Sequence, residues 1–126
     1  MTLFDTDVFI WYQRGNVKAM QLIDDQDELF ISAQTYMELL QCASSKKQLV
    51  LVRSFLRDFG FAVLPITENI SHRASIYVEQ YTLTHHVRAG DALVAATAIE
   101  HNFPLITGNA KHFRHIPGLE LNVFKP

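Results

Sequence analysis

The sequence predicts a three-layer α/β fold, with helices on both faces of a central parallel sheet. Short apolar segments of strand length alternate along the chain with longer segments of helical periodicity. This alternation is typical of parallel sheets, because parallel strands need crossover connections and the crossing helices cover the sheet. The 126 residues, 48% of them hydrophobic, are enough for one domain over residues 1–126 with a substantial core.

The first half of the chain begins with a predicted strand over Thr2–Asp5. The next segment predicts a helix over Val8–Arg14. Thr6 is its expected N-cap, because a hydroxyl can accept from the free backbone N–H groups, and Gly15 is its expected end, because glycine tolerates the backbone conformation of a helix C-terminus. The other elements predicted in this half are a helix over Val17–Asp24, a strand over Leu29–Ile31, a helix from the Ser32 cap to about Ala43, and a helix over Lys46–Phe59 that Gly60 stops.

The second half continues the alternation. Phe61–Ile66 is the next predicted strand, and a longer helix spans Glu68–Thr84. The alanine-rich segment Asp91–His101 predicts a closely packed helix, and Leu105–Thr107 and Leu121–Val123 complete the set of strands. Strand and helix therefore alternate along the whole chain.

The charge balance limits how this chain could bind nucleic acid. The net charge is −2, with 11 Lys and Arg against 13 Asp and Glu. A protein that coats duplex DNA by bulk electrostatics is usually basic. Binding to nucleic acid would therefore depend on a local basic rim or on a bound metal ion.

The cysteine content and the hydropathy of the sequence indicate where in the cell the protein is expected. Cys42 is the only cysteine, which excludes an internal disulfide and predicts a reducing cytoplasm, with Cys42 as a small buried side chain. No apolar run approaches the roughly 20 residues of a membrane span, so no membrane association is expected. We also expect no signal peptide, because the N-terminus lacks a basic leader and Asp5 interrupts its apolar stretch.

Polar side chains gather after the predicted strands. In parallel α/β folds, ligands bind at the carboxyl ends of the strands, where loops and helix starts converge. The side chains placed there are Asp5 and Asp7 after the first strand, Glu38 on the helix after Leu29–Ile31, Asp91 directly after Gly90, and Thr107 and Asn109 after Leu105–Ile106.

This set of oxygen donors favours divalent-metal phosphoryl transfer. Mg²⁺ binds a few carboxylates together with water and substrate phosphate, and it can activate a water nucleophile. Each residue also has a purely structural interpretation: Asp5 and Asp91 as helix caps, Asp7 as a complement to a helix dipole, Glu38 as a solvated helix residue and Asn109 as a turn residue.

Taken together, four stretches resemble the ordered motifs of PIN domains, in particular the VapC-type toxins of bacterial toxin–antitoxin pairs. They are LFDTDVFIW, ISAQTYMELL, GDALVAATA and LITGNAKHF, and the final HIPGLELNVF is similar to the usual closing strand. Any one of these motifs recurs by chance, but four in order over nearly the whole chain form a specific signal. The resemblance implies a PIN-like fold and an acidic magnesium site.

The resemblance also implies roles for individual residues. It places the acidic positions on Asp5, Glu38 and Asp91, with Asp5 and Asp91 holding the metal, and the fourth position on Asn109. An asparagine there is a departure from an all-acid pattern, which puts a second metal in doubt. Asp7 stands close by and could restore the missing carboxylate, and Thr107 is a supporting hydroxyl.

The activity implied by the resemblance is that of a magnesium-dependent endoribonuclease, with Mn²⁺ as the alternative ion. The implied partners are an RNA substrate and a cognate antitoxin protein, which often inserts a basic or aromatic residue into the acidic site. A homodimer is also expected, with apolar helix surface forming the contact or receiving the antitoxin.

Basic residues beside the acidic motifs are candidates for holding RNA phosphates. These are Arg14, Arg88, Lys111 and Arg114, although solubilising surface charge is an equally good interpretation of each. The histidines His85, His86, His112 and His115 match no zinc-binding pattern, and we predict no catalytic role for them.

Two other protein classes, a phosphatase and a receiver domain, fit less well than the nuclease. A haloacid dehalogenase-type phosphatase would share Asp5 and Asp7 but needs a late acidic pair, whereas Asp91 is followed by Ala-Leu-Val-Ala-Ala. A receiver domain needs an aspartate after its middle strand, where this chain has Thr67 and Glu68. A PIN-fold module that binds RNA or protein without cleavage stays open, because Asn109 brings no charge.

Overall fold

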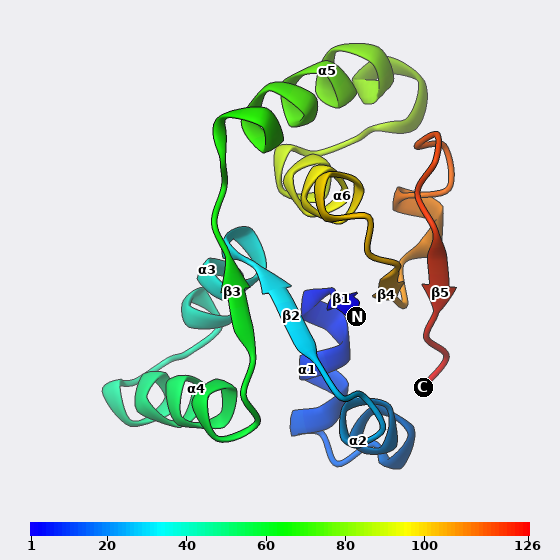
Figure 1. Ribbon diagram of the computed structural model, residues 1–126. Coiled ribbons are helices and arrows are strands. Elements are labelled where there is room, and N and C mark those ends of the chain that lie inside the picture. The colour runs from blue at the N-terminus through cyan, green and yellow to red at the C-terminus, as the bar shows by residue number, and fades with distance from the viewer.

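The computed structural model describes all residues, Met1–Pro126, and has the three layers that the sequence predicts (Figure 1). Five strands alternate with six helices. The elements are β1 (Thr2–Phe4), α1 (Thr6–Gln13), α2 (Val17–Asp24), β2 (Leu29–Ser32), α3 (Ala33–Gln41), α4 (Lys46–Asp58), β3 (Ala62–Leu64), α5 (Glu68–His85), α6 (Ala89–His101), β4 (Leu105–Thr107), the 3₁₀ helix η1 (Ala110–His112) and β5 (Leu121–Val123).

The strands form one sheet in the order β3-β2-β1-β4-β5, and every neighbouring pair is parallel. From β1 the chain builds β2 and β3 on one side, then crosses back to build β4 and β5 on the other. The strand order therefore reverses between β1 and β4, where Leu3 pairs with Leu105 and Phe4 with Ile106. In open parallel sheets, the crevice at such a reversal, outside the carboxyl ends, is the usual place for a ligand.

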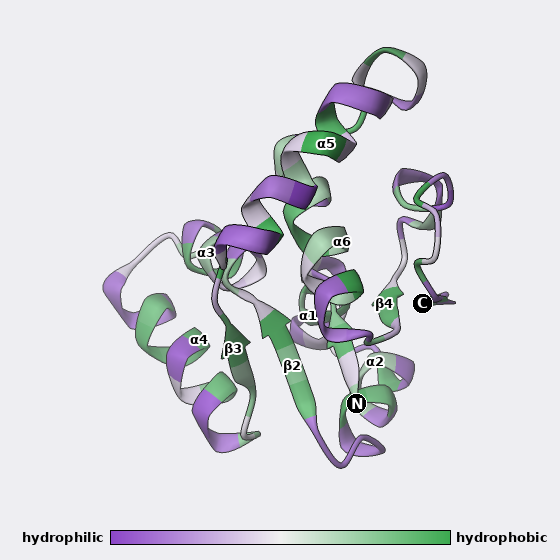
Figure 2. Ribbon diagram, turned by 45° about the horizontal axis from the view of Figure 1, so that its top comes forward, coloured by the Kyte–Doolittle hydropathy of each residue, from purple (hydrophilic) through white to green (hydrophobic).

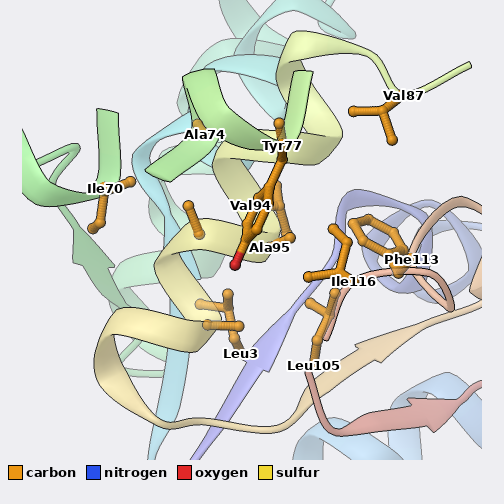
Figure 3. Packing of buried hydrophobic residues seen from close by; sticks show 13 residues of the cluster. Leu3, Ile70, Ala74, Tyr77, Val87, Val94, Ala95, Leu105, Phe113 and Ile116 are labelled. Atoms are coloured by element: carbon orange, nitrogen blue, oxygen red, sulfur yellow. The ribbon is translucent and has the colours of Figure 1, made fainter. Parts of the chain in front are cut away.

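Side chains of the central strands alternate between two cores, because successive residues of a strand point to opposite faces. On one face, Leu3 and Leu105 pack with α5, α6 and the segment after η1 (Figure 3). On the other face, Phe4 and Ile106 pack with α1, α2, α3 and α4. Both faces of the sheet are thus covered, and the two central strands, β1 and β4, are buried.

Two helix starts differ from the sequence prediction. The cap of α1 is Asp5, whose carboxylate accepts from the backbone N–H of Thr6, so Thr6 is the first helical residue and not the cap. The helix α6 begins at Ala89, two residues earlier than predicted, which places Asp91 in its first turn. The Ser32 cap of α3 is confirmed, with its hydroxyl accepting from the Thr35 N–H.

The prediction for Cys42 was wrong: the cysteine is exposed at the C-terminal end of α3. It lies beside α4, which contributes only Leu56 to the fully buried residues and presents both hydrophobic and hydrophilic segments (Figure 2). Because α4 packs at the edge of the fold, residues beside it, such as Cys42, stay exposed to solvent, whereas α6 has six buried residues. None of the helices combines the length and the apolar character needed to cross a membrane.

Candidate active site

Asp5 lies at the carboxyl end of β1, at the reversal of strand order, and is only 8% exposed. Its Oδ1 accepts from the Thr6 N–H at 2.8 Å, and its Oδ2 accepts from the Thr107 hydroxyl at 2.8 Å. The Thr107 Oγ1 in turn accepts from the Asn109 N–H at 3.0 Å. A chain of hydrogen bonds therefore joins the ends of β1 and β4 and fixes the Asp5 carboxylate between them.

The environment of Asp5 disfavours its negative charge. Burial, together with the neighbouring carboxylate of Asp7 and a smaller contribution from Asp91, raises the pKa of Asp5 to about 7. The hydrogen bonds from Thr107 and Thr6 act in the opposite direction but do not compensate. A bound cation would stabilise the charged form of a carboxylate that is buried beside other carboxylates.

Asp7 lies in the first turn of α1 and reaches across to β4. Its Oδ2 accepts from the Gly108 N–H at 2.7 Å, while its Oδ1 is buried and has no hydrogen-bond partner. Burial also raises the pKa of Asp7. An unpartnered buried carboxylate oxygen is costly and rare, and is commonly explained by an absent water or ion.

Gly108 permits this approach of Asp7. A Cβ atom at position 108 would lie 2.5 Å from the Asp7 Oδ2 and 3.4 Å from the backbone oxygen of Phe124. A real Cβ does not tolerate the first of these distances, so any side chain at position 108 would displace the Asp7 carboxylate.

The substitution Gly108→Ala tests the close approach. We expect it to lower the free energy of unfolding by about 1–3 kcal/mol, as overpacking of a tight contact usually does. Urea unfolding of a double-mutant cycle with Asp7→Ala measures the coupling. Because Asp7→Ala removes the obstructing carboxylate, Gly108→Ala should lower the free energy of unfolding clearly less in the Asp7→Ala background than in wild type. An equal loss of stability in both backgrounds would contradict the proposed contact.

Glu38 is half-buried on α3, with both carboxylate oxygens already oriented. Its Oε2 accepts from the Thr6 hydroxyl at 2.8 Å, and its Oε1 accepts from the Gln34 amide at 3.0 Å. Thr6 therefore holds two of the acidic residues at once, donating its N–H to Asp5 and its hydroxyl to Glu38. Sequence reasoning missed both Thr6 and Gln34 in this role. The contact of Thr6 with Glu38 depends on the packing of α1 against α3, whereas Gln34 lies one turn before Glu38 on the same helix, a spacing that could have identified it.

Asp91 is brought to Glu38 by a close approach of α6 to α3. A Cβ at Gly90 would lie 2.9 Å from the Gln34 Nε2 and 3.3 Å from the Glu38 Oε1, so the absence of a side chain at position 90 allows the contact. Burial raises the pKa of Asp91, His112 and Arg88 lower it, and Glu38 raises it. All four carboxylates thus belong to one cluster.

One histidine belongs to this cluster as well. The Nδ1 of His112 lies 3.4 Å from the Asp91 Oδ2. Sequence reasoning predicted no role for the histidines, because no local spacing relates His112 to Asp91. The only available signal was its place in the last motif, LITGNAKHF, which also carries Thr107 and Asn109.

The remaining predicted residues are placed less uniformly. Asn109 is exposed, and its side chain makes no capping hydrogen bond. Arg88 immediately precedes α6 and is close enough to Asp91 to lower its pKa. Lys111 and Arg114 are exposed on η1 and just after it. The structure does not bring Arg14 to the cluster: it lies at the opposite end of α1 from Asp5, with its guanidinium 5.2 Å from the Trp11 ring centre.

The cluster fits a divalent ion that keeps much of its water. No three side chains among the His, Cys, Asp and Glu residues are close enough together to hold a metal ion by themselves. Mg²⁺ rarely needs such a cage, since it is usually bound by one or two carboxylates, with water and substrate phosphate filling the other positions. Asp5 and Asp91 supply carboxylates of this kind, and the unpartnered Oδ1 of Asp7 agrees with a missing water or ion.

A second feature lies on the other side of the sheet from α5 and α6. The helices α1, α3 and α4 surround an apolar groove, here called the α4 groove. It is lined by Phe9, Tyr12, Gln13, Leu39, Cys42, Ala43, Ser44, Gln48, Leu51, Val52, Phe55 and Leu56. An adjoining depression on α4 shares Leu51 and carries Lys46, Lys47 and Arg53. Exposed apolar surface of this kind is typical of a protein-binding site.

Comparison with known proteins gives consistent similarities. The sequence profile of the PIN domain family matches residues 2–119. Ribonuclease VapC1 of Rickettsia felis is 30% identical over 125 residues, 94% of this chain and 92% of the relative. Ribonuclease VapC10 of Mycobacterium tuberculosis is 33% identical over 117 residues, covering 90% and 86% of the two chains. A chain of a toxin–antitoxin complex from Klebsiella pneumoniae superposes with a TM-score of 0.79 at 30% identity, covering 94% of this chain and 95% of that one.

Proposed function

This chain belongs to the PIN domain family, and we propose that it is a metal-dependent endoribonuclease and the toxin of a toxin–antitoxin pair. The observation that carries the proposal is the carboxylate cluster at the reversal of strand order, centred on the buried Asp5. Relatives named ribonucleases over nearly the whole chain, and a similar chain in a toxin–antitoxin complex, support it.

We assign the residues of the cluster different roles in phosphodiester hydrolysis. A bound Mg²⁺ would activate a water molecule and stabilise negative charge on the phosphate oxygens. Asp5 and Asp91 would hold the ion. Glu38, whose two oxygens are fixed by Thr6 and Gln34, would orient the attacking water.

Asp7 takes the place of the missing fourth carboxylate. The neutral side chain at the corresponding position, Asn109, is exposed, whereas the Asp7 carboxylate is close enough to Asp5 to raise its pKa. Thr107 supports the site by donating its hydroxyl to Asp5. The negative charge of an all-acid site is thus retained at a different position.

Substrate RNA approaches over a local basic rim. Arg88, Lys111 and Arg114 are exposed on the segments that carry Asp91 and His112, so they hold phosphates next to the scissile bond. Arg14 has no part in this rim because of its position at the far end of α1.

The antitoxin binds the α4 groove through an apolar and acidic segment. The groove offers apolar side chains, and the adjoining Lys46, Lys47 and Arg53 complement negative charge. The homodimer and the cytoplasmic location predicted from the sequence stay predictions.

An RNA cleavage assay tests the proposed function. With Mg²⁺ present, the wild-type protein should cut RNA, EDTA should stop the reaction, and Asp91→Asn should lower the rate by about 100-fold or more because it removes a metal-binding charge. Asp58→Asn is the matched control, since Asp58 is a solvent-exposed acid on α4.

The assay also separates the enzyme from the non-cleaving alternative. If wild type and Asp91→Asn cut RNA equally slowly at every Mg²⁺ concentration, the chain is a binding module and the enzymatic proposal is wrong. RNA binding by both proteins, measured by fluorescence anisotropy, would then establish the alternative.

A further inference from the structure

Two histidines from different segments stack on each other beside the basic rim. His85 is the last residue of α5, and His115 lies three residues beyond η1. Their ring centres are 4.3 Å apart, with an angle of 17° between the ring planes. Tyr81 packs edge-on against His115, with 4.7 Å between the ring centres. None of these three rings belongs to the carboxylate cluster.

Both segments that carry the stack are anchored in the same hydrophobic core. Val87, two residues after His85, is buried between α5 and α6. Phe113 and Ile116, on either side of His115, belong to the same core cluster (Figure 3). The two imidazoles are therefore held in position before any ligand binds, which reduces the entropy that binding would cost.

His115 is the uncharged support of the stack. Both of its ring nitrogens are buried and have no hydrogen-bond partner. Burial lowers the pKa of His115, and the neighbouring His85 acts in the same direction. The His115 ring therefore stays neutral near pH 7 and offers a flat aromatic face instead of a charge.

His85 presents the open side of the stack. Its side chain is exposed, although His115 covers one face of the imidazole. The Thr84 hydroxyl lies 2.8 Å from the His85 Nδ1 and occupies that edge of the ring. Solvent therefore reaches the face that is turned away from His115, and a planar ligand could stack there.

The stack also lies near the carboxylate cluster. Arg88 follows His85 by three residues, and His112 precedes His115 by three. A segment of three residues spans at most about 11 Å. Arg88 and His112 are both close enough to Asp91 to lower its pKa. A strand whose phosphates lie on the basic rim would therefore carry its neighbouring bases past the stack.

We infer that His85, supported by His115, is a stacking site for an unpaired base of single-stranded RNA next to the scissile phosphate; this inference rests on the proposed function. Proteins commonly bind single-stranded RNA by stacking its bases on aromatic side chains, histidine among them. Stacking uses the π face that every base has, so it tolerates different sequences. The site therefore selects unpaired RNA, because a duplex keeps its bases stacked on one another.

Binding of two oligomers with and without bases tests this inference. One is a short single-stranded oligoadenylate, and the other is an abasic oligomer of the same length, which keeps the phosphates. All measurements use Asp91→Asn as the parent protein with Mg²⁺ present, so that the RNA stays intact. We expect His85→Ala to weaken oligoadenylate binding by about fivefold to 150-fold, the usual effect of one lost base stack. Binding of the abasic oligomer should change by less than about twofold.

Three further variants of the parent identify the kind of contact. His85→Phe keeps a flat aromatic face without ring nitrogens and should hold the oligoadenylate affinity within about threefold of the parent. Lys111→Ala should weaken binding of both oligomers alike, because it removes a phosphate contact. The matched control His72→Ala removes an exposed histidine from the first half of α5 and should change neither affinity.

Proton NMR of the parent protein provides an independent readout. On addition of oligoadenylate, the imidazole C–H resonances of His85 should move upfield, because a stacked purine shields protons that lie over its face. The abasic oligomer should leave these resonances unchanged. The spectrum of His85→Phe identifies them by their absence.

The outcomes separate this inference from the proposed function. Equal weakening of both oligomers by His85→Ala, or no weakening of either, would overturn the stacking site alone. A parent protein that binds oligoadenylate no better than the abasic oligomer would do the same. Stacking of oligoadenylate on a chain whose wild type cuts no RNA would support the stacking site and count against the ribonuclease. A chain that neither binds nor cuts RNA would overturn both.

Discussion

The substitution Asp5→Asn is expected to abolish RNA cleavage and, at the same time, to stabilise the metal-free protein. Asp5 is the most buried carboxylate of the cluster, so its charge is both the most costly without an ion and the best placed to hold one. We expect cleavage to fall by about 1,000-fold or more, because the neutral amide cannot replace a carboxylate as a metal ligand. Functional sites commonly trade stability for activity in this way.

The sign of the stability effect follows from the pKa of Asp5. Its folded-state pKa of about 7 lies above the ordinary value of 3.8, so the folded protein holds a proton that the unfolded chain releases. Wild-type stability should therefore fall as the pH rises from about 4 to about 7 and then stay level. A rise in pKa of this size corresponds at most to roughly 4 kcal/mol.

Urea unfolding in EDTA at about pH 5 and about pH 8 measures this effect. Asp5→Asn should be more stable than wild type at the higher pH, by about 1–3 kcal/mol. It should also lose less stability than wild type when the pH is raised from about 5 to about 8. Added Mn²⁺ should stabilise wild type but not the variant, because only wild type binds the ion tightly in its folded state. The control Asp58→Asn should behave like wild type.

The result could contradict this account in two ways. If Asp5→Asn is less stable than wild type at the higher pH, the hydrogen bonds from Thr6 and Thr107 outweigh the cost of burying the charge. If Asp5→Asn retains full cleavage, Asp5 has no role in binding the ion.

The layers of the fold could be predicted from the sequence because they depend on local patterns. Apolar runs such as Leu105–Thr107 and the alanine-rich segment before His101 have periods that identify buried strands and packed helices. The boundaries were less certain. At the start of α1, Asp5 and Thr6 are both good capping residues, and the choice between them depends on the backbone angles of the turn.

The candidate site was predictable in part. Asp5 and Thr107 end neighbouring strands, so the topology alone brings them together, and the hydrogen bond between them spans 102 residues of sequence. Contacts between side chains on different helices were not predictable. The pairs Thr6–Glu38 and Asp91–His112 depend on how closely α3, α6 and η1 approach the sheet. The exposure of Cys42 likewise follows from the edge position of α4.

The second large effect concerns the antitoxin: Leu51→Glu should weaken antitoxin binding by about 100-fold or more without changing RNA cleavage. Leu51 is 59% exposed and lines both the α4 groove and the adjoining basic depression. Because the side chain is exposed in the free protein, a glutamate there should leave folding unchanged. In the complex the same carboxylate would be buried against apolar surface and would repel an acidic partner, at a cost of several kcal/mol.

Titration of the purified cognate antitoxin against both proteins measures this loss, and Leu83→Glu provides the matched control. Leu83 is 91% exposed on α5, outside the residues that line the α4 groove, so the same change of charge there should leave the affinity unchanged. If the two variants bind the antitoxin equally well, the α4 groove is not the contact. If Leu51→Glu also lowers cleavage, its effect reaches the carboxylate cluster through α1 or α3, since both helices line the groove and also carry site residues.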